Sequence, residues 1–175
     1  MKQNTQTKCV FLDRDGVLNR ERGDYTWRLE DFDVLPGVPE ALQLLKENGY
    51  LLIVITNQGG IAKGLYTRED VFACHRKLQQ ACNGMIDALY YAPSHPSVSE
   101  SLSRKPDSLM LEKAMAKFNI APENSWFVGD KKRDLQAAAK VNVKAILVGE
   151  EETYAHPFRE TDLLAAARFI MGQKG

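Results

Sequence analysis

Short apolar runs alternate with segments of helical periodicity along most of the chain, and this alternation limits the folds that are open to it. The run at residues 50–56, YLLIVIT, is rich in branched side chains, which is typical of a strand buried on both faces. Strands separated by helices are typical of a parallel sheet with helices packed on both sides. The sequence therefore predicts an α/β fold with a central parallel sheet between two helical layers.

The same pattern places the individual elements. Strands are expected at residues 9–13, 50–56, 85–91, 125–129 and 145–148. Helices are expected at residues 38–48, from 67 to about 82, from 105 to about 118, at 135–139 and at 162–171. The stretch 92–103 is rich in serine and proline and is expected to form a loop. No repeat or linker divides the chain, so we expect one domain over residues 1–175, with residues 1–7 as a flexible N-terminal tail.

Composition argues against several classes of protein. Lysine plus arginine equals aspartate plus glutamate at 23 each, and a chain of zero formal net charge is not expected to bind nucleic acid. No apolar stretch is long enough to span a bilayer, and the polar start lacks the apolar segment of a secretory signal. The three cysteines form no CxxC pair, which fits free thiols in a reducing compartment. We expect a cytoplasmic protein without a membrane partner.

Charged and polar side chains follow the predicted strands. They lie in four short segments: Asp13-Arg14-Asp15-Gly16, Thr56-Asn57-Gln58, Arg104-Lys105, and Asp130-Lys131 with Asp134. Ligands of open parallel sheets bind beyond the carboxyl ends of the strands. Carboxylates, cations and a hydroxyl gathered there suit a divalent cation bound together with a phosphate group. A lone DxD would say little, but the four segments in this order predict a phosphate-processing site.

The residues of this site have distinct expected roles in phosphate transfer. Asp13 can attack phosphorus and form an acyl phosphate. Asp15 can protonate the leaving alkoxide and later accept a proton from the attacking water. Thr56 can donate a hydrogen bond to the phosphoryl oxygens, and Lys105 can offset the repulsion between carboxylate and phosphate.

Three of the aspartates are the expected magnesium ligands. Magnesium prefers octahedral oxygen coordination and keeps several waters. The carboxylates of Asp13 and Asp130 and the peptide oxygen of Asp15 can supply the protein ligands. Asp134 is expected to lie just beyond them.

Four motifs carry a resemblance to a known family. They are FLDRDGVLN at residues 11–19, VITNQGGIAKG at 54–64, RKP at 104–106, and VGDKKRDLQAA at 128–138. Together they resemble the haloacid dehalogenase superfamily of aspartate-nucleophile phosphatases. Within it they are similar to the heptose 1,7-bisphosphate 7-phosphatases and the related histidinol-phosphate phosphatases. The resemblance implies a Rossmann-like three-layer sandwich with a small flap after the first motif, no large cap domain, and a monomer.

The resemblance also implies which residues meet the substrate. It supports Asp13, Asp15, Thr56 and Lys105 as the catalytic set, and it assigns substrate recognition to Arg104. The further positions expected to contact substrate are Arg14, Asn19, Glu21, Arg22, Gly23, Tyr25, Asn57, Gln58, Gly59 and Lys131.

One departure from the family concerns zinc. Many members carry a C-x-H…C-x-C zinc loop before the RKP motif, whereas this chain has Ala92-Pro93-Ser94 and Ser101-Leu102-Ser103 there. A structural zinc needs about four ligands, which His95 alone cannot supply. We expect magnesium and no zinc, with the loop held by packing and stiffened by its prolines. The altered loop leaves the exact substrate and anomer open.

The leading functional hypothesis is hydrolysis of the 7-phosphate of a heptose 1,7-bisphosphate, a step in carbohydrate metabolism toward lipopolysaccharide and other cell-surface glycans. Alternatives are a histidinol-phosphate phosphatase, a phosphatase for another small sugar phosphate, and a catalytically silent phosphate-binding protein. Arg104 argues against histidinol phosphate because it would repel an ammonium group. The presence of every catalytic residue argues against a silent protein.

Overall fold

All strands of the central sheet run in the same direction. The computed structural model describes residues 6–149 and 154–173. Within them lies a 6-stranded sheet in the order β3-β2-β1-β4-β5-β6, and each neighbouring pair is parallel. The strands are β1 (Cys9–Leu12), β2 (Leu51–Asn57), β3 (Ala88–Ala92), β4 (Trp126–Gly129), β5 (Lys144–Val148) and β6 (Arg159–Glu160).

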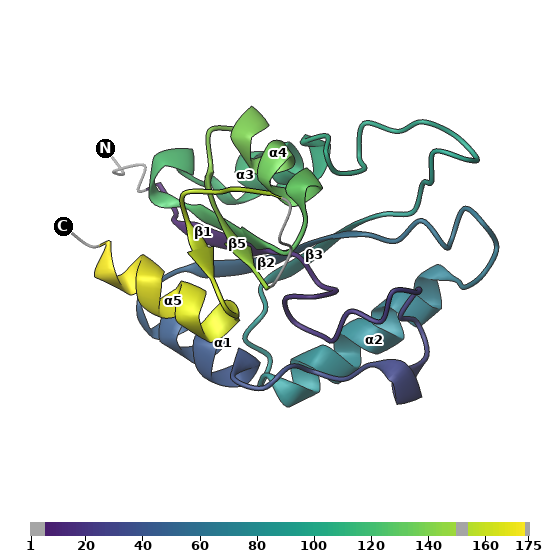
Figure 1. The fold of residues 1–175 in the computed structure, drawn as a ribbon, viewed down its shortest axis with the longest axis horizontal. Helices are drawn as coiled ribbons and strands as arrows, with labels where there is room; N and C mark the ends of the chain where they lie inside the picture. The colour runs from purple at the N-terminus through teal and green to yellow at the C-terminus, as the bar shows by residue number, and fades with distance from the viewer. Residues whose placement is uncertain (1–5, 150–153, 174–175) are drawn as a thin grey trace.

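Helices cover both faces of this sheet (Figure 1). On one face lie α1 (Val38–Glu47), α2 (Arg68–Ala81) and α5 (Leu163–Gly172), and on the other lie α3 (Leu109–Phe118) and α4 (Lys132–Lys140). Short 3₁₀ turns occur at Leu29–Asp31 and Pro122–Asn124. The predicted Rossmann-like three-layer sandwich with a parallel sheet is confirmed.

Alternation of side chains along the strands explains the two cores. Successive side chains of a strand point to opposite faces. Accordingly, Val10 and Leu12 of β1 pack into the core under α1, α2 and α5, whereas Cys9 and Phe11 pack into the core under α3 and α4. All four are fully buried. A strand with apolar residues at every position therefore belongs in the middle of a sheet covered on both sides.

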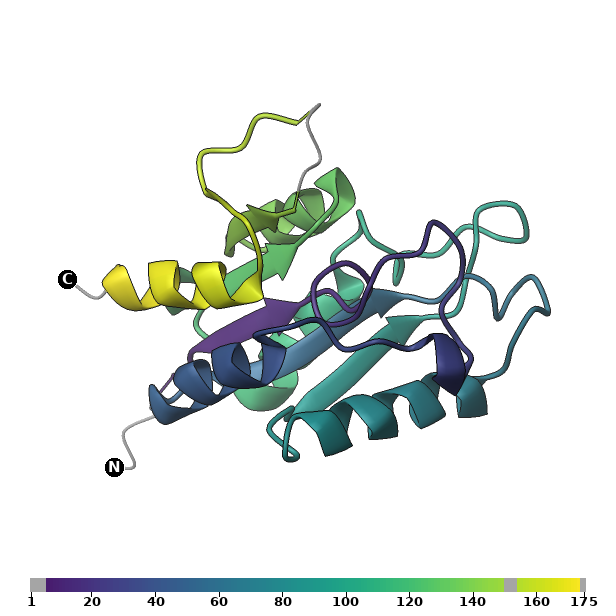
Figure 2. The ribbon, with the colours of Figure 1, turned by 60° about the horizontal axis from the view of Figure 1, so that its bottom comes forward.

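The strand order reverses next to β1, and this reversal creates the site. From β1 the chain proceeds outward through β2 and β3, then returns to place β4 on the other side of β1. At such a switch point the connections leave in opposite directions and open a crevice at the carboxyl ends of the strands. The segments that follow β1 and β3 project from this end of the sheet (Figure 2).

The connection between β1 and α1 contains the flap, which we define as residues 20–35. It is closed at its base by an isolated bridge between Asn19 and Val34. The Trp27 ring stacks on Tyr66 at a centroid distance of 6.1 Å, so the flap is packed against the segment before α2. No cap domain interrupts residues 6–149 or 154–173, as the resemblance implied.

Two predicted boundaries were wrong. Helix α3 begins at Leu109 rather than at residue 105, because the side chain of Asn57 holds the backbone of Lys105 in a non-helical segment. Strand β3 begins at Ala88 rather than at residue 85, because the Gln79 side chain bonds both backbone groups of Ile86.

Other differences are small. Helix α4 begins at Lys132, three residues before the prediction, because the Asp134 side chain accepts a hydrogen bond from the Lys131 N–H and caps the first turn. The two-residue strand β6 was not predicted.

The start of the described chain is joined to the segment that follows α3. The predicted tail at residues 1–7 falls mostly on residues 1–5, which lie outside the described residues. Thr7 exchanges backbone hydrogen bonds with Asn119 and Ala121 at 2.9 and 2.8 Å. None of the described helices is long and apolar enough to cross a membrane.

Candidate active site

Asp13 follows β1 directly and forms the floor of the site. It is 3% exposed. Its Oδ1 accepts a hydrogen bond from Lys105 Nζ at 2.8 Å and another from the backbone N–H of Arg14 at 2.8 Å. Its Oδ2 accepts no hydrogen bond from any described residue. These contacts orient the carboxylate and leave one oxygen for an incoming partner.

Lys105 is a buried cation beneath the site. Its ammonium donates to the carbonyl of Ile55 at 2.7 Å and lies 2.7 Å from Asp134 Oδ1, in addition to its bond to Asp13. Burial alone lowers the pKa of a lysine, but the facing carboxylates of Asp13 and Asp134 raise the pKa of Lys105 overall. Lys105 therefore remains charged and offsets the negative charge around Asp13.

Asn57 fixes the position of Lys105. Its amide Nδ2 donates to the Lys105 carbonyl and its Oδ1 accepts from the Lys105 N–H, both at 3.0 Å. These two bonds tie the end of β2 to the segment before α3. They position the side chain of Lys105 next to Asp13.

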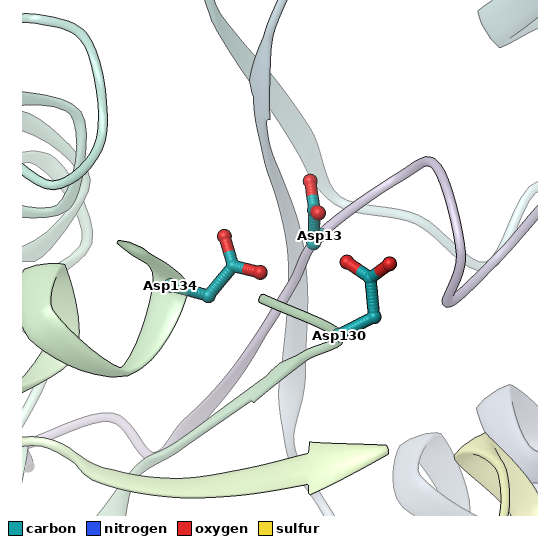
Figure 3. A group of neighbouring side chains, drawn as sticks. All are labelled: Asp13, Asp130 and Asp134. Carbon is teal, nitrogen blue, oxygen red and sulfur yellow. The ribbon is translucent and has the colours of Figure 1, made fainter. Parts of the chain in front are cut away.

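Three carboxylates lie close together in the site (Figure 3). Asp13 follows β1, Asp130 follows β4, and Asp134 lies in the first turn of α4. Ligand oxygens of the three lie within 4.8 Å of one another. Gly16 permits this approach, because a Cβ there would lie 2.2 Å from Asp130 Oδ2 and its φ of +87° disfavours other residues.

This crowding leaves negative charge uncompensated. Burial and the neighbouring Asp13 and Asp134 raise the pKa of Asp130 to about 8, and burial with Asp134 raises the pKa of Asp13. The buried Oδ1 of Asp130 has no hydrogen-bond partner among the described residues. Hard oxygen donors that repel one another, one of them without a hydrogen-bond partner, fit a divalent cation such as magnesium. In the described ranges this is the one cluster of acidic, histidine or cysteine side chains close enough to hold a metal.

Asp15 is held at the edge of the site by four donors. Arg14 donates from Nε and Nη2 at 3.2 and 3.0 Å, Asn19 donates to Oδ1 at 2.9 Å, and Gln58 donates to Oδ2 at 3.3 Å. Arg14 also donates to the carbonyl of Thr26 in the flap at 2.6 Å. Arg14 and Asn19, which we expected to contact substrate, are buried and do not line the cavity described below.

Gln58 connects Asp15 to Thr56. Its Nε2 donates to Thr56 Oγ1 at 2.9 Å as well as to Asp15, and its Oε1 accepts from the Tyr66 hydroxyl at 2.7 Å. Burial raises the pKa of Tyr66 to about 12, so its hydroxyl stays protonated and donates. Since Thr56 Oγ1 accepts from Gln58, its own hydroxyl proton remains to be donated toward a phosphate.

A cavity of about 470 Å³ is lined by Asp15, Asn57 and Gln58 of this site, whereas Asp13, Thr56 and Lys105 are not among its lining residues. This volume is typical of sites for small molecules. The residues that we expected to contact substrate and that line the cavity are Glu21, Gly23, Tyr25, Asn57, Gln58, Gly59, Arg104 and Lys131, beside the predicted acid Asp15.

The cavity also has walls that the sequence did not indicate. Thr26 and Arg133 line it, although neither was expected there, and so does Asp24, which lies within the expected segment between Gly23 and Tyr25. Arg133 was missed because the run at residues 131–133 is basic throughout, and a string of cations does not show which one faces inward. Arg22, in contrast, was expected to contact substrate but forms an ion pair with Asp31 in the flap and does not line the cavity.

The loop without the zinc motif is held by hydrogen bonds. Ser97 Oγ lies 2.8 Å from His95 Nδ1, and the hydroxyls of Ser101 and Ser103 lie 2.7 Å apart. Arg104 Nη1 donates to the Ser94 carbonyl at 3.2 Å. Polar pairs and the Arg104 contact thus supplement the packing that the prolines led us to expect.

Comparison with known proteins finds relatives over most of the chain. Residues 102–169 match the HAD-hydrolase-like family. The chain is 38% identical over 146 residues to the D-glycero-beta-D-manno-heptose-1,7-bisphosphate 7-phosphatase of Haemophilus ducreyi, covering 78% of this chain and 80% of that one. It is also 38% identical over 159 residues to the D-glycero-alpha-D-manno-heptose-1,7-bisphosphate 7-phosphatase of Campylobacter jejuni, covering 89% and 90%.

A solved structure extends the similarity to the fold. The crystal structure of D,D-heptose 1,7-bisphosphate phosphatase from B. bronchiseptica, complexed with magnesium and phosphate, matches with a TM-score of 0.86 at 27% identity. The match covers 95% of this chain and 99% of the other. The resemblance carried by the four motifs is confirmed.

Proposed function

The chain belongs to the haloacid-dehalogenase-like phosphatases that include the heptose-1,7-bisphosphate 7-phosphatases, and from this membership we propose that it hydrolyses the 7-phosphate of a D-glycero-D-manno-heptose 1,7-bisphosphate. Membership of this family makes the chain a phosphatase. The observation that carries the proposal is a buried Asp13–Lys105 pair close in sequence to Asp15, which lines a cavity with several cations on its walls. One phosphate would lie at Asp13, and the cations of the cavity would bind a second anionic group.

Asp13 is the nucleophile of the proposed reaction. Its carboxylate attacks phosphorus, and the bond from phosphorus to the sugar oxygen breaks as the acyl phosphate forms. Lys105 holds the carboxylate in place and reduces its repulsion from the phosphate. Thr56 donates its hydroxyl proton to a phosphoryl oxygen as charge develops there.

Asp15 transfers a proton in each of the two steps. In the first step it donates a proton to the leaving sugar alkoxide, and in the second it takes a proton from the water that attacks the acyl phosphate. The bond between Asp13 and phosphorus then breaks and releases inorganic phosphate. Gln58 is the longest of the Asp15 contacts, at 3.3 Å, so it is the contact that most easily yields when Asp15 carries a proton.

The carboxylates of Asp13 and Asp130 and the peptide oxygen of Asp15 would hold magnesium. When bound, magnesium supplies positive charge that orients the phosphate and offsets its charge during transfer. Asp134 pairs with Lys105 and accepts a hydrogen bond from the backbone of Lys131, and we infer from these contacts that it lies beside the metal ligands.

Arg104 and Lys131 make a bisphosphate the better substrate. Both line the cavity, and Lys131 Nζ lies 3.3 Å from Asp130 Oδ2. Histidinol phosphate would present an ammonium group to this cationic wall, which is unfavourable. We therefore favour the heptose bisphosphate over the histidinol alternative.

Phosphate release from a substrate panel tests the proposal. The panel contains both anomers of heptose 1,7-bisphosphate, histidinol phosphate, a few hexose phosphates and an aryl phosphate, each with magnesium. A clear preference for a heptose bisphosphate supports the proposal, and the preferred anomer assigns the enzyme within its family. A preference for histidinol phosphate would overturn it.

We further propose a cytoplasmic monomer without zinc or a nucleic-acid partner, as the sequence led us to expect. Metal analysis of the purified protein tests the zinc prediction, and one tightly bound zinc per chain would contradict it. Sedimentation of the protein at several concentrations tests the monomer.

A further inference from the structure

Arg133 is a cavity-lining cation that the proposed chemistry does not use. It lies in the first turn of α4, and its Nε is buried without a hydrogen-bond partner among the described residues. No carboxylate of the described chain lies within 4 Å of its guanidinium, whereas Arg14, Arg22 and Arg168 each pair with one. A partly buried guanidinium with no anion costs free energy unless a ligand supplies one.

A second guanidinium faces the same space. Arg104 also lines the cavity, and among the described residues its guanidinium donates one hydrogen bond, to the neutral carbonyl of Ser94. Burial and the nearby charge of Arg133 lower the pKa of Arg104. Two like charges that approach each other in a cavity are stabilised by an anion placed between them.

The flap contributes lining residues of a different chemistry. Glu21 Oε1 accepts hydrogen bonds from the backbone N–H groups of Arg22 and Gly23 at 2.8 and 2.9 Å, and Asp24 Oδ1 accepts from the Tyr25 N–H at 2.7 Å. Carboxylate oxygens fixed in this way repel phosphate and accept hydrogen bonds from sugar hydroxyls. The cavity thus has a cationic side for an anion and a flap side for a hydroxylated chain.

We propose that Arg133 joins Arg104 in a second anion site and determines specificity there by binding the phosphate of a sugar bisphosphate that is not hydrolysed. Guanidinium groups bind phosphate through paired, charge-assisted hydrogen bonds, which gives Arg133 a geometric as well as an electrostatic role. The inference rests on the proposed function and adds Arg133 as a residue that determines specificity.

Arg133→Met and a neighbouring control variant test the assignment. Arg133→Met removes the guanidinium and keeps a long apolar side chain. We expect kcat/KM for the heptose bisphosphate to fall by about 10- to 100-fold, mainly through KM, and kcat/KM for the heptose 7-monophosphate to fall less than about threefold. Arg133→Lys should recover part of the loss in kcat/KM, because lysine keeps the positive charge but lacks the planar guanidinium.

Lys132→Met is the matched control. Lys132 is the adjacent cation, but its ammonium lies over the Tyr154 ring at 5.2 Å and does not line the cavity. Lys132→Met should leave kcat/KM for both substrates unchanged. If Lys132→Met and Arg133→Met lower kcat/KM equally, Arg133 acts only through the net charge, and the proposal is overturned.

A second readout measures the second anion site by inhibition. Heptose 1-phosphate, the expected product, carries only the phosphate that this site would hold. Its inhibition constant should rise about tenfold or more in Arg133→Met, and an unchanged constant would contradict the proposal.

The outcomes separate the inference from the proposed function. If the wild type prefers the bisphosphate and Arg133→Met keeps that preference, Arg133 is not part of the second site while the proposed function stands. If Arg133→Met slows both substrates equally, Arg133 acts on the reacting phosphate and the inference fails. If the wild type hydrolyses the aryl phosphate but shows no preference for the bisphosphate, the proposed function fails and takes the inference with it.

Discussion

At the scale of the residue, the site depends on a buried carboxylate held in one orientation. Asp13 and Lys105 are 3% and 1% exposed, and they face each other at 2.8 Å. Removing one charge of such a pair leaves the other uncompensated, so the two residues act as a unit. The proposed nucleophile, Asp13, should for this reason be sensitive to a change of one atom.

Asp13→Asn should abolish turnover and leave the fold intact. The amide has nearly the same shape as the carboxylate but cannot form the acyl phosphate, so we expect kcat to fall on the order of 10⁴-fold or more. Asp107→Asn is the control, because Asp107 is exposed and pairs with Lys140 outside the site at 2.6 Å. Phosphate release and circular dichroism of both variants check the prediction, and substantial turnover in Asp13→Asn would exclude the covalent mechanism.

Gln58 should act on the rate more than on binding. Gln58→Leu removes the donor that directs both Thr56 and Asp15, and a small displacement of catalytic groups costs up to about 100-fold. We expect kcat to fall by about 10- to 100-fold with little change in KM. Tyr66→Phe, which removes the bond that orients the Gln58 amide, should give a smaller loss in the same direction. A change confined to KM would instead make Gln58 a substrate contact.

At the scale of the element, the strand ends and the segments between strands were not equally predictable. The strands and their order along the chain followed from apolar runs, because residues such as Val10 and Phe11 must be buried on opposite faces. The start of α3 did not follow, because it depends on the contact between Asn57 and Lys105, 48 residues apart. Long-range contacts of this kind leave no periodic signal in the sequence.

Asn57→Ala should loosen the join between β2 and the segment before α3. The variant leaves the N–H and carbonyl of Lys105 without partners, which costs about 2 kcal/mol of the free energy of unfolding. Asn57→Asp keeps an acceptor for the N–H and loses the donor, so its loss of stability should be smaller than that of Asn57→Ala. Denaturant unfolding of the three proteins measures this order, and an unchanged stability of Asn57→Ala would show that the two bonds contribute nothing.

At the scale of the whole molecule, the gathering of the candidate site residues in one place could be predicted. Asp13, Asp15, Thr56, Lys105 and Asp130 could be found because the parallel sheet brings the ends of β1, β2 and β4 together. The different positions of the arginine side chains could not be predicted. Arg14 is turned inward by Asp15 and the flap, whereas Arg133 faces the cavity, and only the packed molecule distinguishes them.

The acidic cluster couples stability to pH and to magnesium. Without metal, the raised pKa values of Asp13 and Asp130 mean that the folded protein binds more protons than the unfolded chain between pH of about 4 and 8. Its stability should therefore fall as pH rises through this window. Magnesium replaces the protons, so the rise in Tm on adding magnesium should grow with pH up to about 8. Thermal unfolding with magnesium or a chelator measures this, and a rise independent of pH would argue against these carboxylates as the ligands.

The central claim is that Asp13 carries the phosphate during turnover of a heptose bisphosphate, and trapping of the intermediate tests it most directly. The enzyme is mixed with heptose 1,7-bisphosphate and magnesium, quenched in acid, reduced with borohydride, and digested for mass spectrometry. Reduction of an acyl phosphate converts the aspartate to homoserine. We predict homoserine at position 13 in the wild type, dependent on substrate, and none there in Asp13→Asn. An unmodified Asp13 during rapid turnover, or a modification at Asp15 or Asp130 instead, would contradict the account.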